Sequence, residues 1–230
     1  MKFYGIGVGP GDEKLLTIKA AEVLAELDVL LIPETKKGKE GVAKKIANKY
    51  LKEDLEIVYV DFPMVVDESV FEEAGQKAAE IIEENVNQGK VVGFITLGDP
   101  SVYSTYGYIV KALKKNTSVP IETIPGITSF CAAAAMANRP LMEKDEILAV
   151  IPMNASDEQI EKVLSFADSF AFMKIYKRES RVISLLKQNH LEENAVMALK
   201  CGFPDAEVKT EGIKALEENK DYLSVLLTRK

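Results

Sequence analysis

The feature that most restricts the fold is the alternation of short apolar runs with longer amphipathic segments along almost the whole chain. Runs rich in β-branched and aromatic residues predict strands at 2–8, 28–33, 56–62, 90–97, 119–124, 146–152, 169–176, 194–200 and 221–228. Helical spacing of apolar residues predicts helices at 13–27, 41–51, 69–88, 102–115, 128–137, 157–165, 179–188 and 211–217. This order is typical of an α/β protein with mixed, largely parallel sheets.

The number of expected strands favours two domains over one. Nine strands would make a wide single sheet. The polar segment 114–120 (KKNTSVP) lies near the middle of the chain, and we interpret it as a hinge. We therefore expect α/β domains at residues 1–117 and 118–230, with a ligand cleft between them. The alternative is that the segment is an ordinary helix-to-strand loop.

Composition excludes several classes of protein. The chain has 29 Lys and Arg against 36 Asp and Glu, a net charge of −7 and no basic block, so we expect no nucleic-acid partner. Cys131 and Cys201 are too few for a disulfide framework, and the single histidine, His190, cannot form a His-rich metal site. No apolar run reaches the ~18–20 residues of a membrane span, and the N-terminus turns polar too early for a signal peptide. We expect a cytoplasmic protein without a metal or membrane.

A first candidate site is the glycine-rich segment 5–12 (GIGVGPGD), directly after the first expected strand. Glycines let a strand end turn sharply and let a ligand approach the backbone, and Asp12 can cap the helix that follows. A dinucleotide fingerprint fits poorly, because its third glycine falls on Pro10 or Asp12, although Glu34 could mimic the ribose-binding acid. A purely structural turn is the other alternative.

A second candidate site is the segment 96–108 (TLGDPSVYSTYGY), where an apolar strand runs into a helical pattern. Asp99 is expected to be the helix N-cap and Pro100 its first residue. Ligands of open α/β sheets bind at the carboxyl ends of strands. Tyr103 and Tyr106 would share a helix face and could wall a flat ligand. The alternative is a buried Tyr103 and an exposed Tyr106.

A third candidate site is the segment 125–135 (PGITSFCAAAA). We expect a turn at its start, a helix capped by Thr128 or Ser129, and small residues that allow close packing against a ligand or, equally, against a sheet. We interpret Cys131 as a packing residue rather than a nucleophile. Basic residues that could meet a polycarboxylate, or simply face solvent, are Lys36, Lys37, Lys39, Lys174, Lys177, Arg178 and Arg181.

At these three segments the chain resembles the tetrapyrrole (corrin and porphyrin) methylase family. The family patterns GxGxGPGD with LLTxKA, GDPxxY and PGITS appear here at 5–12 with 15–20, at 98–103 and at 125–129, in the same order. The stretches LGDPSVYSTYGYI, IPGITSFCAAAA, FMKIYKR and DYLSVLLTRK are most similar to the methyltransferases that act on C-20 of precorrin-2 or cobalt-factor II in cobalamin synthesis. Diphthine synthases, methylases of other corrin positions and non-catalytic nucleotide-binding modules remain alternatives.

The resemblance implies two α/β domains, a homodimer, and S-adenosylmethionine bound between the domains mainly through backbone atoms. Carried over to this chain, it implies that the cofactor contacts Pro10, Gly98, Asp99, Val102, Tyr103, Thr128, Ser129 and Met173, and more weakly Cys201 and Ser224. The substrate would be a tetrapyrrole rich in carboxylates, and we expect Lys174, Lys177 and Arg178 to contact it.

The expected reaction needs no nucleophilic side chain, because the sulfonium methyl group is already electrophilic and orientation alone can supply roughly 7–11 kcal/mol. Proton loss from the methylated carbon does need an acceptor. Asp99 is our candidate for that base. Helix capping is its alternative role.

Overall fold

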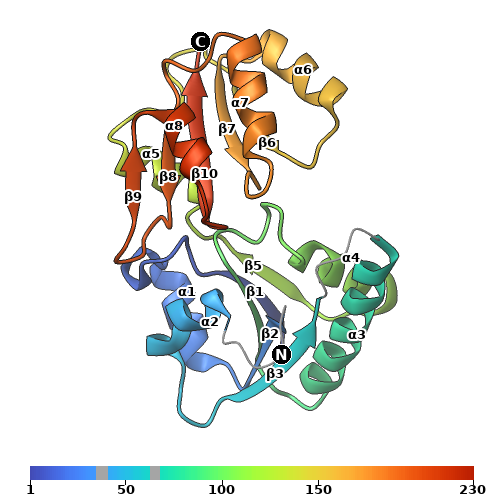
Figure 1. Ribbon diagram of the computed structural model, residues 1–230. Helices are drawn as coiled ribbons and strands as arrows, with labels where there is room; N and C mark the ends of the chain where they lie inside the picture. The colour runs from blue at the N-terminus through green and yellow to red at the C-terminus, as the bar shows by residue number, and fades with distance from the viewer. Residues whose placement is uncertain (35–40, 63–67) are drawn as a thin grey trace. The chain divides into compact units, whose positions relative to one another are not determined.

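The computed structural model describes residues 1–34, 41–62 and 68–230, and the chain divides into two compact units, Met1–Thr128 and Ser129–Lys230 (Figure 1). The division falls after the boundary that we expected at residue 117. The reason is that strand β5 (Ile121–Ile124) pairs in parallel with strand β1 (Phe3–Gly7), so that the chain returns to the first sheet before it leaves the first unit.

The first unit is a five-stranded sheet in the order β3-β2-β4-β1-β5, and each neighbouring pair is parallel. Its remaining strands are β2 (Val29–Glu34), β3 (Glu56–Asp61) and β4 (Val92–Thr96). Its helices are η1 (Glu13–Leu15), α1 (Ile18–Glu26), α2 (Val42–Ala47), η2 (Asn48–Tyr50), α3 (Glu68–Asn87) and α4 (Tyr106–Asn116). The parallel arrangement confirms the α/β class.

Helices cover both faces of this sheet, which explains why its strands are apolar at consecutive positions. In β2, Val29 and Leu31 pack with the residues of α3 and α4. Leu30 and Ile32 pack on the opposite face with the residues of α1 and α2. The sheet therefore lies between two helical layers (Figure 1).

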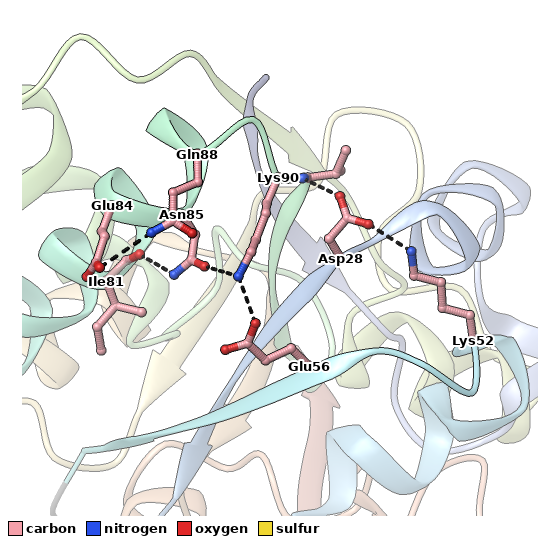
Figure 2. A network of polar contacts seen from close by, with 9 residues as sticks. Asp28, Lys52, Glu56, Ile81, Glu84, Asn85, Gln88 and Lys90 are labelled. Carbon is pink, nitrogen blue, oxygen red and sulfur yellow. Dashed lines mark hydrogen bonds and ion pairs between the residues drawn. The ribbon is translucent and has the colours of Figure 1, made fainter.

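A polar network joins the amino ends of β2, β3 and β4 (Figure 2). The Asp28 carboxylate accepts the Val91 N–H at 2.8 Å and the Lys52 ammonium at 2.9 Å. The ammonium of Lys90 donates to Glu56 and to the buried Asn85, both at 2.9 Å. The pKa of Asp28 is lowered, first by the Val91 hydrogen bond and then by Lys52. These contacts fix the register at the edge opposite to the three glycine-containing loops.

The second unit is a mixed sheet in the order β6-β7-β10-β8-β9, in which β6 and β7 are parallel and the other pairs are antiparallel. Its strands are β6 (Leu148–Pro152), β7 (Ser169–Met173), β8 (Val196–Leu199), β9 (Glu207–Lys209) and β10 (Ser224–Arg229). Its helices are α5 (Ser129–Met136), α6 (Asp157–Phe166), α7 (Glu179–Gln188) and α8 (Gly212–Glu218). The sequence did not predict β9.

One core fills the second unit on the side of α6, α7 and α8, with Phe170, Phe172 and Leu226 contributed by the sheet. The apolar helix α5 contacts β8 and β10. A capping box starts α6, because Ser156 and Gln159 exchange side-chain and backbone hydrogen bonds. Over residues 1–34, 41–62 and 68–230, none of the helices has both the length and the apolar character required to cross a membrane.

Candidate functional site

Three loops meet at the carboxyl edge of the first sheet, after β1, β4 and β5. Gly9 and Gly98 join the first two loops as an isolated antiparallel bridge. The Gly98 N–H donates to the Gly9 carbonyl at 2.8 Å, and the Gly9 N–H donates to the Gly98 carbonyl at 3.2 Å. Both glycines have positive φ, +75° at Gly9 and +70° at Gly98, which other residues adopt rarely. The predicted glycine turns therefore form one joined structure.

The side chain of Asp99 connects the second loop to the third. One carboxylate oxygen accepts the Gly126 N–H at 2.9 Å, and the other accepts the Ser101 N–H at 2.8 Å together with the Ser101 hydroxyl. Partial burial acts to raise the pKa of Asp99, but the hydrogen bonds from Ser101 and Gly126 outweigh it and the pKa is lowered. A carboxylate held in this way is a weak proton acceptor, which favours a positioning role for Asp99.

The expected helix start at Asp99 and Pro100 is wrong. Helix α4 begins at Tyr106, and residues 101–105 form turns and bends with Tyr103 at φ +50°. Asp99 is nevertheless a capping side chain, but it caps a tight turn and a neighbouring loop instead of a helix. The misleading signal was the Asp-Pro pair, which is common at both kinds of site.

Tyr103 and Tyr106 consequently do not share a helix face. Tyr103 is 47% exposed on the loop, whereas Tyr106 is buried and its hydroxyl lies 2.6 Å from Thr123 Oγ1. The alternative that we considered, a buried Tyr103 and an exposed Tyr106, is the reverse of this arrangement. The Tyr106 ring occupies the space that a Cβ atom at Gly5 would need, so Gly5 serves packing.

Gly7 and Gly126 bring the three loops into close contact. A Cβ atom at Gly7 would lie 2.6 Å from the Gly98 carbonyl oxygen and 2.7 Å from the Gly126 nitrogen. A Cβ atom at Gly126 would collide with the same carbonyl oxygen. Pro10, which follows Gly9 in the sequence, is buried, and Val102 is half-buried. Backbone atoms rather than side chains thus form much of this edge.

Among the residues of the third segment, Thr128 ends the first unit and Ser129 is the first residue of α5. Both are half-buried. The small residues Ala132, Ala133 and Ala134 are buried, which fits the alternative that this run packs helix α5 closely. Cys131 is exposed, so our interpretation of it as a packing residue is wrong.

The candidate residues of the second unit lie at one edge of its sheet. Met173 is the last residue of β7, and its carbonyl accepts the Met153 N–H at 2.9 Å. Ser224 is the first residue of β10, pairs with Leu199 of β8 and donates its hydroxyl hydrogen to the Asp221 carbonyl at 3.1 Å. Cys201 follows β8 and is buried, and burial raises the pKa of its thiol to about 11. The thiol is therefore neutral near pH 7 and suits packing rather than nucleophilic attack.

The basic candidates Lys174, Lys177 and Arg178 lie on the loop between β7 and α7, and all three are exposed. Lys174 and Lys177 have φ of +58° and +63°. The pKa of Lys174 is lowered, first by desolvation and then by the charge of Arg178. The structure separates Arg181 from this group, because its guanidinium bonds Asp157 and the carbonyls of Met153 and Ala155. The cluster Lys36, Lys37 and Lys39 lies outside the described residues, as does the side chain of Glu34.

The parallel sheet and its backbone-lined carboxyl edge define an α/β protein that can hold a polar organic ligand through main-chain atoms. A family model described as Tetrapyrrole (Corrin/Porphyrin) Methylases matches residues 2–217. The chain belongs to this family.

Two curated relatives are similar over most of their length. The cobalt-precorrin-2 C(20)-methyltransferase of Salmonella typhimurium is 37% identical over 88% of this chain and 85% of its own length. A probable cobalt-precorrin-2 C(20)-methyltransferase of Methanocaldococcus jannaschii is 34% identical over 100% of this chain and 96% of its own length.

Solved structures confirm the fold. A cobalt precorrin-4 methyltransferase superposes with a TM-score of 0.75 at 22% identity, covering 99% of this chain and 94% of its own. A uroporphyrin-III C-methyltransferase of Thermus thermophilus in complex with S-adenosyl homocysteine gives a TM-score of 0.72 at 19% identity, covering 100% and 98%. At these identities the likeness concerns the fold alone.

Proposed function

We propose that the chain is an S-adenosylmethionine-dependent methyltransferase that methylates C-20 of precorrin-2 or cobalt-factor II in cobalamin biosynthesis. The observation that carries this proposal is the 37% identity, over 88% of the chain, to a protein named for that reaction. The second relative at 34% identity over the whole chain supports the same position of methylation.

The described loops suit the cofactor. S-adenosylmethionine supplies an electrophilic methyl group, and the protein has to bind and orient it. The edge has no room for an added Cβ atom at Gly7 or Gly126, and the positive φ of Gly98 disfavours a side chain there, so a ligand at this edge would meet main-chain N–H and C=O groups. In the proposal, the cofactor contacts Pro10, Gly98, Asp99, Val102, Tyr103, Thr128, Ser129, Met173, Cys201 and Ser224. That residues of both units contact the cofactor stays a prediction.

Asp99 acts in this proposal by holding the loops in position. Its two oxygens are occupied by Ser101 and Gly126, and its lowered pKa makes it a poor acceptor for the C-20 proton. Orientation of the methyl group toward the macrocycle carbon is then the main catalytic contribution of the chain. The base role of Asp99 remains the competing hypothesis.

The substrate is a planar ring with several carboxylates, and the protein is acidic overall, with a net charge of −7. Local cations are therefore needed to attract it. Lys174, Lys177 and Arg178 are proposed as these cations, because they lie together at the carboxyl end of β7. We further propose a homodimer in the cytoplasm, with no nucleic-acid or membrane partner.

The test is incubation of the protein with methyl-labelled S-adenosylmethionine and, in separate reactions, precorrin-2, cobalt-factor II and uroporphyrinogen III. The proposal expects the first or the second to gain the mass of one methyl group at C-20, with uroporphyrinogen III unchanged. Cofactor binding without transfer would favour a nucleotide-binding module. Methylation of another carbon would agree with the family assignment but would contradict the proposed C-20 position. The Gly7→Ala variant should abolish the reaction, whereas Gly107→Ala should not.

A further inference from the structure

A pair of tyrosines stands at the same edge of the second sheet as the basic loop. Tyr176, between β7 and α7, and Tyr222, just before β10, pack edge to face, with ring centroids 5.9 Å apart and planes at 75°. Tyr222 is 63% exposed. Among the ring pairs of the described residues, this pair has the most exposed member.

The two loops that carry these rings are connected to each other. A single carboxylate oxygen of Glu179 accepts the Lys177 N–H at 3.1 Å and the Asn219 side-chain amide at 2.9 Å. Asn219 in turn accepts the Asp221 N–H at 3.1 Å, next to Tyr222. The rings therefore rest on a hydrogen-bonded support rather than on two independent loops.

Two cations follow Tyr176 on its loop. The ammonium of Lys177 lies 5.4 Å from the centroid of the Tyr176 ring, and the exposed Arg178 follows it. The nearby acid Asp221 is already paired with Lys200 at 3.2 Å. Neither Lys177 nor Arg178 forms an ion pair with another of the described residues, and an exposed aromatic face next to such cations suits a ligand that is both planar and anionic.

We propose that Tyr222, supported by Tyr176, is a substrate-positioning residue whose ring packs against the tetrapyrrole macrocycle while Lys177 and Arg178 meet its carboxylates. This inference rests on the proposed function. A neutral nucleobase would also stack on a tyrosine, but it would gain little from the two cations, so the observations favour the macrocycle over the cofactor.

The experiment compares Tyr222→Ala and Tyr222→Phe with the wild type. Tyr59→Ala is the matched control, because Tyr59 is a 49% exposed tyrosine with the Lys44 ammonium 6.0 Å from its ring centroid, on β3 of the first unit. Stacking on an aromatic side chain is worth enough that Tyr222→Ala should raise the KM for the tetrapyrrole on the order of tenfold. Tyr222→Phe should keep KM within about twofold, because it keeps the ring.

The result is decided by KM, kcat and a separate calorimetric Kd for S-adenosylhomocysteine. The inference is supported if Tyr222→Ala raises KM and leaves kcat and Kd unchanged, and if Tyr59→Ala does not raise KM. An unchanged KM overturns it, as does a Kd that rises in parallel, or a Tyr222→Phe variant as impaired as Tyr222→Ala.

Failure of the proposed function would be visible as a wild type that transfers no methyl group. Titration with uroporphyrin, a planar polycarboxylate probe, then decides the inference by itself. Binding that weakens on the order of tenfold in Tyr222→Ala, but not in Tyr59→Ala, supports it. No binding by the wild type, or equal binding by all variants, overturns it.

Discussion

The Asp99 carboxylate accepts the Gly126 N–H at 2.9 Å and thereby ties the loop after β4 to the loop after β5. The same side chain holds Ser101 through its other oxygen. Two turns that are far apart in sequence thus depend on one partly buried charge. Such an arrangement makes Asp99 important for the shape of the edge whether or not it contacts the substrate.

Asp99→Asn should lower the free energy of unfolding by roughly 1–3 kcal/mol, because an amide offers one acceptor oxygen and turns its NH₂ group toward an N–H donor. Urea unfolding measures this change. The exposed Asp145→Asn is the control and should differ from the wild type by less than about 0.5 kcal/mol. Equal stability of both variants would mean that the contact with Gly126 contributes little.

The same variant separates positioning from base catalysis. With a positioning role, the Kd for S-adenosylhomocysteine should rise in Asp99→Asn, while kcat at saturating concentrations of both substrates stays within a few-fold of the wild type. A loss of about 10²-fold or more in kcat with an unchanged Kd would instead identify Asp99 as the base.

Acid should reduce the stability difference between the wild type and Asp99→Asn. The folded pKa of Asp99 is lowered, because its hydrogen bonds outweigh its desolvation, so its contribution is present above the unfolded pKa of about 3.9 and is lost as the pH falls through the folded pKa. The difference in free energy of unfolding between the wild type and Asp99→Asn, measured by urea unfolding, should therefore be smaller at about pH 3 than at about pH 6. A gap of constant size would contradict the lowered pKa.

Alanine at two glycines should have opposite effects. Gly7→Ala places a methyl group 2.6 Å from the Gly98 carbonyl oxygen. We therefore expect the free energy of unfolding to fall by roughly 1–3 kcal/mol or more, and S-adenosylhomocysteine binding to be lost. Gly107 in α4 has open space around it, so Gly107→Ala should be neutral or stabilising by up to about 1 kcal/mol. Thermal unfolding and calorimetry measure both. A stable, ligand-binding Gly7→Ala protein would show that the loops can separate.

The sequence predicted those parts of the fold that are set by local pattern. The strand expected at 90–97 forms as β4, and its residues pack in the cores on both faces of the sheet. Strand β9 was missed because Glu207–Lys209 is short and mostly polar, and its pairing with β8 is a tertiary contact. The division by contacts after Thr128 likewise depends on a tertiary contact, since the pairing of β5 with β1 leaves no local signal.

In the candidate site, the sequence singled out the three glycine-containing loops as candidates but did not indicate how they meet. Asp99 looked like a helix cap because its partner Gly126 lies in another loop. The burial of Tyr106 depends on the missing side chain of Gly5 on a neighbouring strand, which no helical periodicity reports. The pairing of Tyr176 with Tyr222 likewise depends on two loops joined through Glu179 and Asn219.

The basic loop gives a prediction with a salt dependence. Replacing Lys177 and Arg178 by Gln together should raise the KM for the tetrapyrrole several-fold at low ionic strength, because each exposed ion pair with a carboxylate is worth up to about 1 kcal/mol. The effect should shrink at high salt, where the screening length falls to a few ångström, roughly 3 Å at 1 M. Steady-state kinetics at two salt concentrations measure both.

Lys162→Gln is the control for this variant, because Lys162 is an exposed lysine of α6 paired with Glu158 on its own helix. It removes positive charge from the same unit but not from the loop, and its KM should equal that of the wild type. If the double variant and the control shift KM equally, the attraction comes from overall charge. If neither shifts it, the carboxylates are bound elsewhere. A selective, salt-sensitive increase requires contact at the carboxyl end of β7.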